Sequence, residues 1–327
     1  MRFLKALLAL LILLAAAIGL AYATAPRLHW PAGAKVAAVV PGADLDAWLT
    51  QHEGVFDDIT TGTEKHITWA GEPGARTSLA LVYLHGYSAT RQEISPVPER
   101  LAQALGANLF ATRFAGHGRS GAALAEATPE DWATDLAEAM AIAARLGDRV
   151  VLIGTSTGAS IATLAALDPA YRDAIAALVM VSPNFELNNP QAFLLDLPYA
   201  ERWVPLVVGE TRSWEPQNDG QARYWTSSYP TRALFAMRAV QRAAGGADHA
   251  AARAPALIFY ATGDQVVLPA ATEGVIARWG APVNGVILQG ADDPGQHVIT
   301  GDLLSPSTTE AVIAQTLDWL RAQRIAP

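Results

Sequence analysis

The chain alternates short apolar runs with stretches of polar and turn-forming residues. The runs Leu79–Leu84 and Ala256–Tyr260 are almost continuously apolar. Strands have this composition when both faces of their sheet are covered, which is typical of parallel sheets flanked by helices. Similar runs predict further strands, and the full set of expected strands is 66–70, 79–84, 107–113, 149–154, 176–182, 255–261 and 283–289.

Helix signals fall between the apolar runs. Thr128 followed by Pro129 is a typical helix start, with threonine as the N-cap and proline at the first helical position, and this helix is expected to end near Leu146. A final amphipathic helix is expected from about Ser307. The alternation predicts an α/β fold, in which a mostly parallel sheet carries helices on both faces.

One long segment, 184–253, breaks this alternation. An insertion at this point is expected to fold over the carboxyl ends of the strands as a cap. Most of its aromatic side chains are expected to form the cap's own small core, and a few to face a pocket below. Arg202, Arg212 and Arg223 are expected to be solvated, unless one of them meets a substrate carboxylate. The aromatic residues are Phe193, Tyr199, Trp203, Trp214, Tyr224, Trp225, Tyr229 and Phe235.

The N-terminus begins with a short basic segment that contains Arg2 and Lys5. Residues 6–26 are uncharged and mostly apolar, and they are closed by Arg27. This pattern directs a chain to a membrane. The stretch is long enough to span a bilayer core of about 30 Å at about 1.5 Å per residue. Ala23-Thr24-Ala25 fits a signal-peptidase site, but Pro26 follows it directly, so an uncleaved anchor is slightly favoured.

We therefore expect four parts: a signal peptide or anchor (1–26), an N-terminal arm (27–65), a core (66–183 with 254–327) and a cap (184–253). The arm contains one predicted helix, Leu45–Glu53. The expected location is the cell envelope. The globular part lies outside the cytoplasm if the anchor stays, because positive charges remain inside, and the protein is periplasmic or secreted if cleaved after Ala25.

Composition narrows the possible partners. Apolar residues make up 51% of the chain, and there is no cysteine, so disulfides and thiol chemistry are excluded. Without Arg2 and Lys5, 21 basic residues face 31 acidic ones, a net charge near −10. An acidic surface argues against nucleic acid as a partner. The sequence shows no metal-ligand cluster and no phosphate-binding glycine loop, so neither a metal nor a cofactor is expected.

The candidate chemistry centres on Gly154-Thr155-Ser156-Thr157-Gly158. This motif follows the apolar run Arg149–Ile153 and precedes a helix-like stretch, so Ser156 lies at the apex of a strand–turn–helix. Glycines at 154 and 158 would let strand and helix approach closely and hold the serine upright. The alternative is an ordinary glycine-rich turn, which the preceding β run makes less favoured.

Two further residues follow Ser156 in the order that a Ser–acid–His triad requires. Asp264 comes just after the run Ala256–Tyr260, at the carboxyl end of a strand, where open α/β sheets place their active sites. His297 lies in the loop before the last helix. Each residue alone has an ordinary structural interpretation, as a turn aspartate or a surface histidine. Together, at three strand ends, the three favour a nucleophile, an orienting acid and a base.

From about Ile67 onward, the chain resembles the α/β-hydrolases of the serine aminopeptidase and monoacylglycerol-lipase-like group. The resemblance implies an α/β-hydrolase fold and an esterase, a lipase or, less often, a peptidase that needs no cofactor. One position departs from the group, which usually has an aspartate where this chain has Arg113. The residues that carry the resemblance are His85-Gly86-Tyr87, Gly116-His117-Gly118-Arg119-Ser120, Ser156, Gly263-Asp264-Gln265-Val266-Val267 and His297.

In this architecture the oxyanion hole takes one backbone N–H from the residue after the nucleophile and one from the loop after an upstream strand. These donors are expected to be Thr157 and Tyr87, which leaves the Tyr87 side chain free to line an acyl pocket. His85 and His117 are expected to be structural.

The sequence thus predicts a carboxylesterase-like serine hydrolase that acts on small or medium apolar esters. A lipase or an aminopeptidase of the same fold is an alternative, the latter less favoured because no acidic pair is evident for a free amino group. From a different class, a non-catalytic, membrane-tethered binding protein is an alternative that the complete triad disfavours. The expected partners are a small-molecule ester and, through residues 6–26 if uncleaved, a membrane.

Overall fold

Seven strands form one sheet in the computed structural model, which describes residues 2–31, 36 and 38–326. Their order across the sheet is β1-β3-β2-β4-β5-β8-β9, and all neighbours are parallel except β1 and β3. Met1 of the predicted basic segment and residues 32–35 and 37 of the predicted arm lie outside the described residues. The strands are β1 (His66–Thr68), β2 (Thr77–Leu84), β3 (Asn108–Ala111), β4 (Gly147–Thr155), β5 (Ile175–Val181), β8 (Ala256–Tyr260) and β9 (Val283–Ile287).

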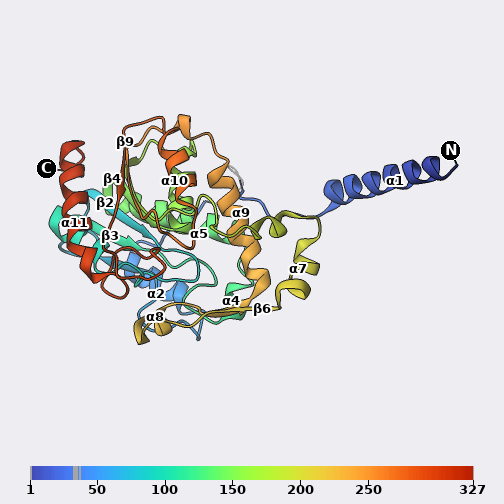
Figure 1. The fold of residues 1–327 in the computed structure, drawn as a ribbon. Helices are drawn as coiled ribbons and strands as arrows, with labels where there is room; N and C mark the ends of the chain where they lie inside the picture. Colours follow the sequence, from blue (N-terminus) through green and yellow to red (C-terminus); the bar gives the residue numbers. More distant parts are fainter. Residues whose placement is uncertain (1, 32–35, 37, 327) are drawn as a thin grey trace.

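Helices cover both faces of this sheet (Figure 1). Leu81 and Tyr83 of β2 belong to one core, together with side chains of α3 and α11. Val82 and Leu84 of the same strand belong to the other core, together with side chains of α5, α6, α9 and α10. Apolar residues are therefore needed at successive positions, because successive side chains point to opposite faces. The core helices are α3 (Val97–Leu105), α4 (Gly121–Leu124), α5 (Pro129–Leu146), α6 (Thr157–Leu167), α10 (Pro269–Ile276) and α11 (Pro306–Ala322).

The predicted α/β-hydrolase fold is confirmed, and its helix starts follow the local sequence. Thr128 caps α5 and accepts a hydrogen bond from the N–H of Asp131, whose carboxylate accepts one from the N–H of Thr128 in return. Such a capping box satisfies two backbone donors that the first helical turn leaves without partners. The helix ends at Leu146, as the sequence predicts.

Between β5 and β8 the chain leaves the sheet and forms small elements instead of a strand–helix repeat. β6 and β7 pair as an antiparallel ribbon, and α9 lies against α6. The elements of this segment are η2 (Ala192–Asp196), α7 (Ala200–Val208), β6 (Thr211–Ser213), α8 (Asp219–Tyr224), β7 (Ser228–Pro230), η3 (Thr231–Ala233), α9 (Leu234–Gly245) and η4 (His249–Ala251).

The aromatic residues of this segment do not form a single cap core. Phe235 is buried with Val204 in a small cluster, against which Trp203 packs. Trp225 instead belongs to the core beneath α3 and α11, and Tyr229 packs on Leu124 of α4. The segment is therefore fixed to the sheet domain by its own aromatic side chains.

The N-terminal helix α1 (Arg2–Thr24) projects away from the rest of the chain, on the side where α7 lies (Figure 1). It has 23 residues, an 18-residue window within it has a mean hydropathy of 2.6, and none of its residues is buried. By length and composition it is able to cross a membrane. Its end is close to the globular part, because the hydroxyls of Thr24 and Tyr199 are 2.8 Å apart.

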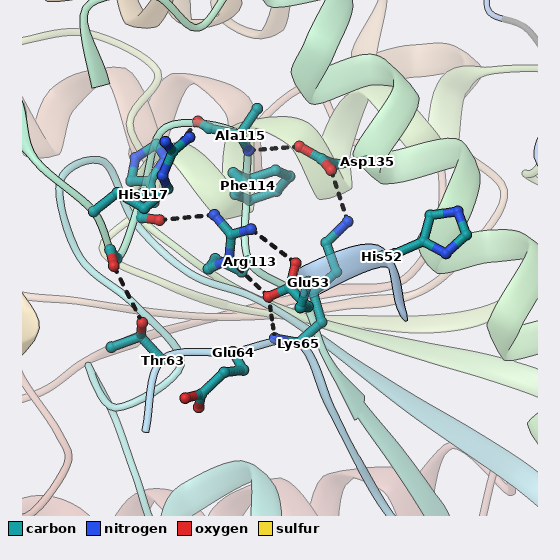
Figure 2. A network of polar contacts seen from close by, with 12 residues as sticks. His52, Glu53, Thr63, Glu64, Lys65, Arg113, Phe114, Ala115, His117 and Asp135 are labelled. Carbon is teal, nitrogen blue, oxygen red and sulfur yellow. Dashed lines mark hydrogen bonds and ion pairs between the residues drawn. The ribbon is translucent and has the colours of Figure 1, made fainter. Parts of the chain in front are cut away.

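The arm docks through α2 (Leu45–Glu53), the helix predicted for it (Figure 2). The Glu53 carboxylate accepts hydrogen bonds of 2.8 and 2.7 Å from the Arg113 guanidinium, which also donates to the carbonyl oxygen of His117. Lys65 contacts Asp135 and Glu138 of α5 at 3.0 and 2.5 Å. Arg113, the position that departs from the pattern of the resembled group, is thus explained by its partner on the arm.

The charges in this network are compatible with burial because each has a partner. Burial alone raises the pKa of Glu53, but hydrogen bonding and charge attraction from Arg113 outweigh it, so the pKa lies below its usual value. The pKa of Lys65 is raised despite burial, because Asp135 and Glu138 stabilise its ammonium form. The Glu53 carboxylate and the Lys65 ammonium are therefore both charged at neutral pH.

Candidate active site

Ser156 lies between the end of β4 and the start of α6, in a strained turn. Its φ of 51° is in the left-handed region that side chains rarely adopt. The glycines on either side permit this geometry: a Cβ at Gly154 would lie 2.7 Å from the backbone of Ala159, and one at Gly158 would lie 2.0 Å from the carbonyl oxygen of Leu84. The N–H of Ser156 donates to the carbonyl oxygen of Val181 at 2.9 Å, which ties the turn to β5.

The structure brings the three predicted residues together. His297 Nε2 lies 3.0 Å from Ser156 Oγ, and His297 Nδ1 lies 2.8 Å from Asp264 Oδ2. The second carboxylate oxygen of Asp264 accepts the N–H groups of Val266 and Val267 at 2.8 and 2.9 Å, which fixes its orientation. The sheet produces this arrangement because β4, β8 and β9 are parallel, so the chain segments that follow them all start from one edge.

The local environment sets the protonation of His297. Burial disfavours the imidazolium and lowers its pKa, but the charge of Asp264 and the hydrogen bond to it have a larger opposite effect. The pKa of His297 is therefore raised above its usual value. The hydrogen bond from Nδ1 to Asp264 leaves Nε2 to accept a proton from the Ser156 hydroxyl when the ring is neutral.

Asp293, a further acid in the loop before His297, does not contact the imidazole in this way. Its carboxylate accepts the N–H groups of Gly295, His297 and Val298, and the side-chain amide of Gln217 at 2.8 Å. Burial raises its pKa, but Gln217 and these backbone donors lower it below the usual value. Asp293 thus shapes the loop that carries the histidine, while Asp264 contacts the imidazole.

The two predicted oxyanion donors, Tyr87 and Thr157, line the same cavity as Ser156. Thr157 is the first residue of α6, so its N–H has no acceptor within the helix. Among the described residues, neither N–H donates a hydrogen bond to the protein. Asn184 supports the turn from below, since its N–H donates to the carbonyl oxygen of Ser156 and its side-chain amide donates to the Thr157 hydroxyl.

His85 and His117 lie beneath the loop after β2. His85 bridges the Gly86 carbonyl oxygen and the N–H of Phe114, and burial holds its pKa well below the usual value. Burial likewise lowers the pKa of His117 to about 4, so both rings are neutral at physiological pH. The Tyr87 ring lies edge-on to His117 and to Tyr229, in an aromatic cluster under the cavity wall.

Sequence reasoning missed Glu93, a buried carboxyl that also lines the cavity. Its Oε2 accepts the N–H of Gly86 at 2.7 Å and the hydroxyl of Tyr83 at 3.1 Å. Burial raises its pKa to about 7. Nothing in the local sequence distinguishes it from a solvated acid in a turn, because its burial depends on how the loop after β2 closes over it.

The cavity at Ser156 has a volume of about 390 Å³. The inserted segment provides a large part of its wall, including the unpredicted polar residues Gln217 and Gln221. Of the three arginines considered in the sequence, Arg212 lies on this wall. Within the described residues, no group of three or more His, Asp or Glu side chains is arranged to hold a metal ion. The residues contributed by the insertion are Asn184, Leu187, Arg212, Trp214, Gln217, Gln221, Trp225, Tyr229 and Met237.

Comparison with known proteins gives a family and a set of similar folds. A family model described as serine aminopeptidase, S33, matches residues 75–288. A structure from work on LipS and LipT, two metagenome-derived lipolytic enzymes, has a TM-score of 0.67 at 20% identity and covers 81% of this chain and 99% of that chain. No curated protein matches the chain in sequence.

Two further similar structures are lipases. The monoacylglycerol lipase of Paleococcus ferrophilus has a TM-score of 0.56 at 16% identity and covers 80% of this chain and 99% of that chain. A soluble variant of monoglyceride lipase from Saccharomyces cerevisiae, in complex with a substrate analog, has a TM-score of 0.56 at 13% identity and covers 90% and 99%. At these identities the likeness concerns the fold.

Proposed function

Because the chain belongs to the serine aminopeptidase family S33 and has its α/β-hydrolase fold, we propose that it is a serine hydrolase that cleaves ester bonds. The observation that carries the proposal is the continuous line of hydrogen bonds from Ser156 through His297 to Asp264. A nucleophile, a base and an orienting acid within hydrogen-bond reach are the parts that acyl transfer needs.

The mechanism follows from these positions. The Ser156 hydroxyl attacks the ester carbonyl while His297 Nε2 takes its proton, and Asp264 stabilises the imidazolium that forms. The N–H groups of Tyr87 and Thr157 donate to the oxyanion of the tetrahedral intermediate. His297 then gives the proton to the leaving alcohol, and a water molecule, activated by the same histidine, hydrolyses the acyl-enzyme. No cofactor takes part in these steps.

The substrate we propose is a small or medium, predominantly apolar ester. The cavity wall contains Trp214, Trp225 and Met237, which suit an acyl or alcohol group without charge. A peptidase of this fold is less favoured, because a substrate's free amino group needs a carboxylate partner. Asp293 is already occupied by four donors, and Glu93 has no cation among the described ion pairs and a pKa of about 7.

The similar structures support the ester proposal, since three of them are described as lipolytic enzymes or lipases. Glyceride cleavage is therefore the nearest variant. For the segment 184–253 we propose the role of a cap, because it supplies much of the cavity wall above Ser156. For α1 we propose a membrane anchor that is not cleaved, with the hydrolase on the extracytoplasmic side.

Labelling with a fluorophosphonate tests the proposal. The full-length protein should form a covalent adduct on Ser156, detected by peptide mass spectrometry, and the Ser156→Ala variant should not react. The rates of cleavage of p-nitrophenyl esters of increasing chain length and of aminoacyl anilides then distinguish an esterase from a peptidase. Faster cleavage of the anilides would move the protein to the peptidase branch. Absence of any adduct would favour the alternative of a non-catalytic binding protein.

A further inference from the structure

We propose that Glu93 is a positioning residue for the oxyanion-binding loop and that only its protonated form supports the reaction. The inference rests on the proposed serine hydrolase function and adds a second ionisation that controls it. Glu93 comes from the turn before α3, far in sequence from Ser156, Asp264 and His297, yet it lines the same cavity.

Glu93 contacts the loop after β2, which carries the proposed oxyanion donor. Glu93 Oε2 accepts the N–H of Gly86 at 2.7 Å, and Gly86 directly precedes Tyr87, whose N–H is the proposed oxyanion donor. The carboxyl group also lies close to Gly86, where a Cβ would be 2.6 Å from Oε1. A side chain at position 86 would therefore displace the Glu93 carboxyl.

Burial also affects the charge of the Glu93 carboxyl. Glu93 is 2% exposed, and no described ion pair includes it. The titratable groups that face it are Tyr83 on β2 and His297 on the loop before α11. Asp293 and Arg212 line the same cavity. Burial without a cation favours the neutral acid, which agrees with a pKa raised to about 7.

The protonation state of Glu93 affects both the oxyanion hole and His297. With the proton on Glu93, the loop is held and no charge stands beside the oxyanion hole. Once Glu93 loses that proton, a negative charge lies one residue from the Tyr87 donor and opposes the charge that develops on the substrate oxygen. The same charge favours the imidazolium form of His297, which cannot act as a base. The active enzyme therefore combines protonated Glu93 with neutral His297.

The experiment compares the rate of fluorophosphonate labelling and of p-nitrophenyl ester turnover from pH 5 to pH 10. We expect a bell-shaped profile for the wild type, with a rising limb from His297 and a falling limb from Glu93. The two apparent pKa values belong to the coupled pair rather than to single residues. If the ionised form is inactive, the rate falls about tenfold per pH unit on the alkaline side.

The test variant is Glu93→Gln, which keeps an acceptor for Gly86 but cannot ionise. Its falling limb should disappear, and its rate at pH 9 should exceed that of the wild type. Glu99→Gln is the matched control, because Glu99 is a partly buried acid whose pKa is also raised by burial but which does not line the cavity. Its profile should keep the wild-type falling limb.

Glu93→Ala separates the positioning role. Without an acceptor for Gly86, we expect kcat to fall while KM changes little, because the oxyanion hole acts on the transition state. Near-UV circular dichroism should show that each variant remains folded. In the wild type, the infrared band of a protonated buried carboxyl should vanish with a midpoint near pH 7, and this change should be missing in Glu93→Gln.

Several outcomes would overturn the proposal. A falling limb that persists unchanged in Glu93→Gln, a wild-type rate that stays level to pH 10, or no infrared carboxyl change near neutrality would each contradict it. These results differ from failure of the proposed function, in which Ser156 would not be labelled at any pH. Unchanged kcat in Glu93→Ala would remove the positioning role.

Discussion

Ser156 has a backbone conformation that the surrounding contacts alone make tolerable. A residue other than glycine with φ of 51° costs on the order of 1–3 kcal/mol. The hydrogen bond to Val181 and the close approach at Gly154 and Gly158 hold it there. Such strain is preserved where a side chain has to be presented to a cavity, which agrees with the proposed nucleophile.

Asp264 is the acid proposed to orient His297, and its replacement tests that role. Asp264→Asn should lower ester turnover by roughly 10³–10⁴-fold, because an amide no longer stabilises the imidazolium or fixes the tautomer of His297. Steady-state kinetics of the purified variant, with Ser156→Ala as the inactive reference, measure the effect. Asp293→Asn should act differently and lower stability, since that residue holds the histidine loop. A severe loss of turnover for Asp293→Asn, with nearly normal Asp264→Asn, would contradict this assignment.

Glu93 provides a prediction on stability that does not involve activity. Its pKa is raised from 4.5 to about 7 in the folded chain, so the unfolded state releases this proton more easily. Stability is therefore lost as the pH rises from 4.5 to 7 and stays lower above it, by about 3 kcal/mol. Glu93→Gln should be more stable than the wild type at pH 8 and similar to it at pH 4.5, as measured by urea unfolding. Equal differences at both pH values would contradict the raised pKa.

The sequence predicts some of these residues and not others for a physical reason. Ser156 and its two glycines lie within five consecutive residues, so the turn that they form can be predicted from the local sequence. Asp264 and His297 are predicted from the sequence because each follows an apolar run that indicates a strand of the parallel sheet. Glu93 and Arg212 have no such local signal, since their positions depend on the closure of a turn and on the path of the insertion. Gly86 offers an indirect hint only once its neighbour is known.

At the scale of elements, the arm is joined to the core by charge. The network around Arg113 lies between α2, the loop after β3 and α5 (Figure 2). The sequence predicts α2 at the observed bounds, because Leu45 and Leu49 form an apolar side and Asp44 supplies the N-cap. It does not predict the partner of Arg113, because Glu53 is 60 residues away.

Replacing Arg113 tests this network. Arg113→Met should destabilise the fold by about 3–5 kcal/mol at pH 7, because the buried Glu53 loses its guanidinium partner and keeps only the N–H of Lys65 as a hydrogen-bond donor. The cost should shrink as the pH falls, first above 4.5, because burial without Arg113 raises the pKa of Glu53 in the variant and favours its neutral form. It should shrink further below 4.5, because the wild-type pair loses its contribution there. Equilibrium unfolding in urea at both pH values measures the change.

Two further variants show whether the ion pair with Glu53 accounts for the effect of Arg113→Met. The double variant Arg113→Met with Glu53→Met should recover most of the loss, because paired apolar replacements of a buried ion pair are often nearly neutral. Arg321→Met removes an exposed pair with Asp318 and should have almost no effect. A double variant as unstable as the single one would show that the hydrogen bond to His117, rather than the ion pair, is the important contact.

At the scale of the whole molecule, the parallel sheet explains why distant residues meet. Ser156, Asp264 and the loop of His297 follow strands that run in one direction, so their side chains converge at one sheet edge. The insertion between β5 and β8 then supplies a large part of the cavity wall at that edge. Its general position is predictable from the break in the strand–helix period. Its internal structure is not, because its aromatic residues pack on the sheet domain as well as on one another.

The helix α1 projects away from the rest of the chain (Figure 1), and its removal provides the last prediction. None of its residues is buried. Its side chains contact the rest of the chain at exposed positions, through the hydroxyls of Thr24 and Tyr199 and through the Tyr22 ring, over which the Arg27 guanidinium lies. One exposed hydrogen bond contributes at most about 1 kcal/mol, so the catalytic part should fold without the helix. A 23-residue helix is about 35 Å long, enough for a bilayer core of about 30 Å.

A chain that starts at Pro26 should therefore keep its ester turnover on water-soluble substrates within about twofold, because the triad and cavity are untouched. It should also move from the membrane fraction to the soluble fraction, as followed by fractionation and fluorophosphonate labelling. For the full-length protein, mass spectrometry of the N-terminus should find residues 2–25 still attached. A soluble, extracytoplasmic form that begins at Pro26 would identify α1 as a cleaved signal peptide, because a retained apolar helix of this length does not leave the bilayer.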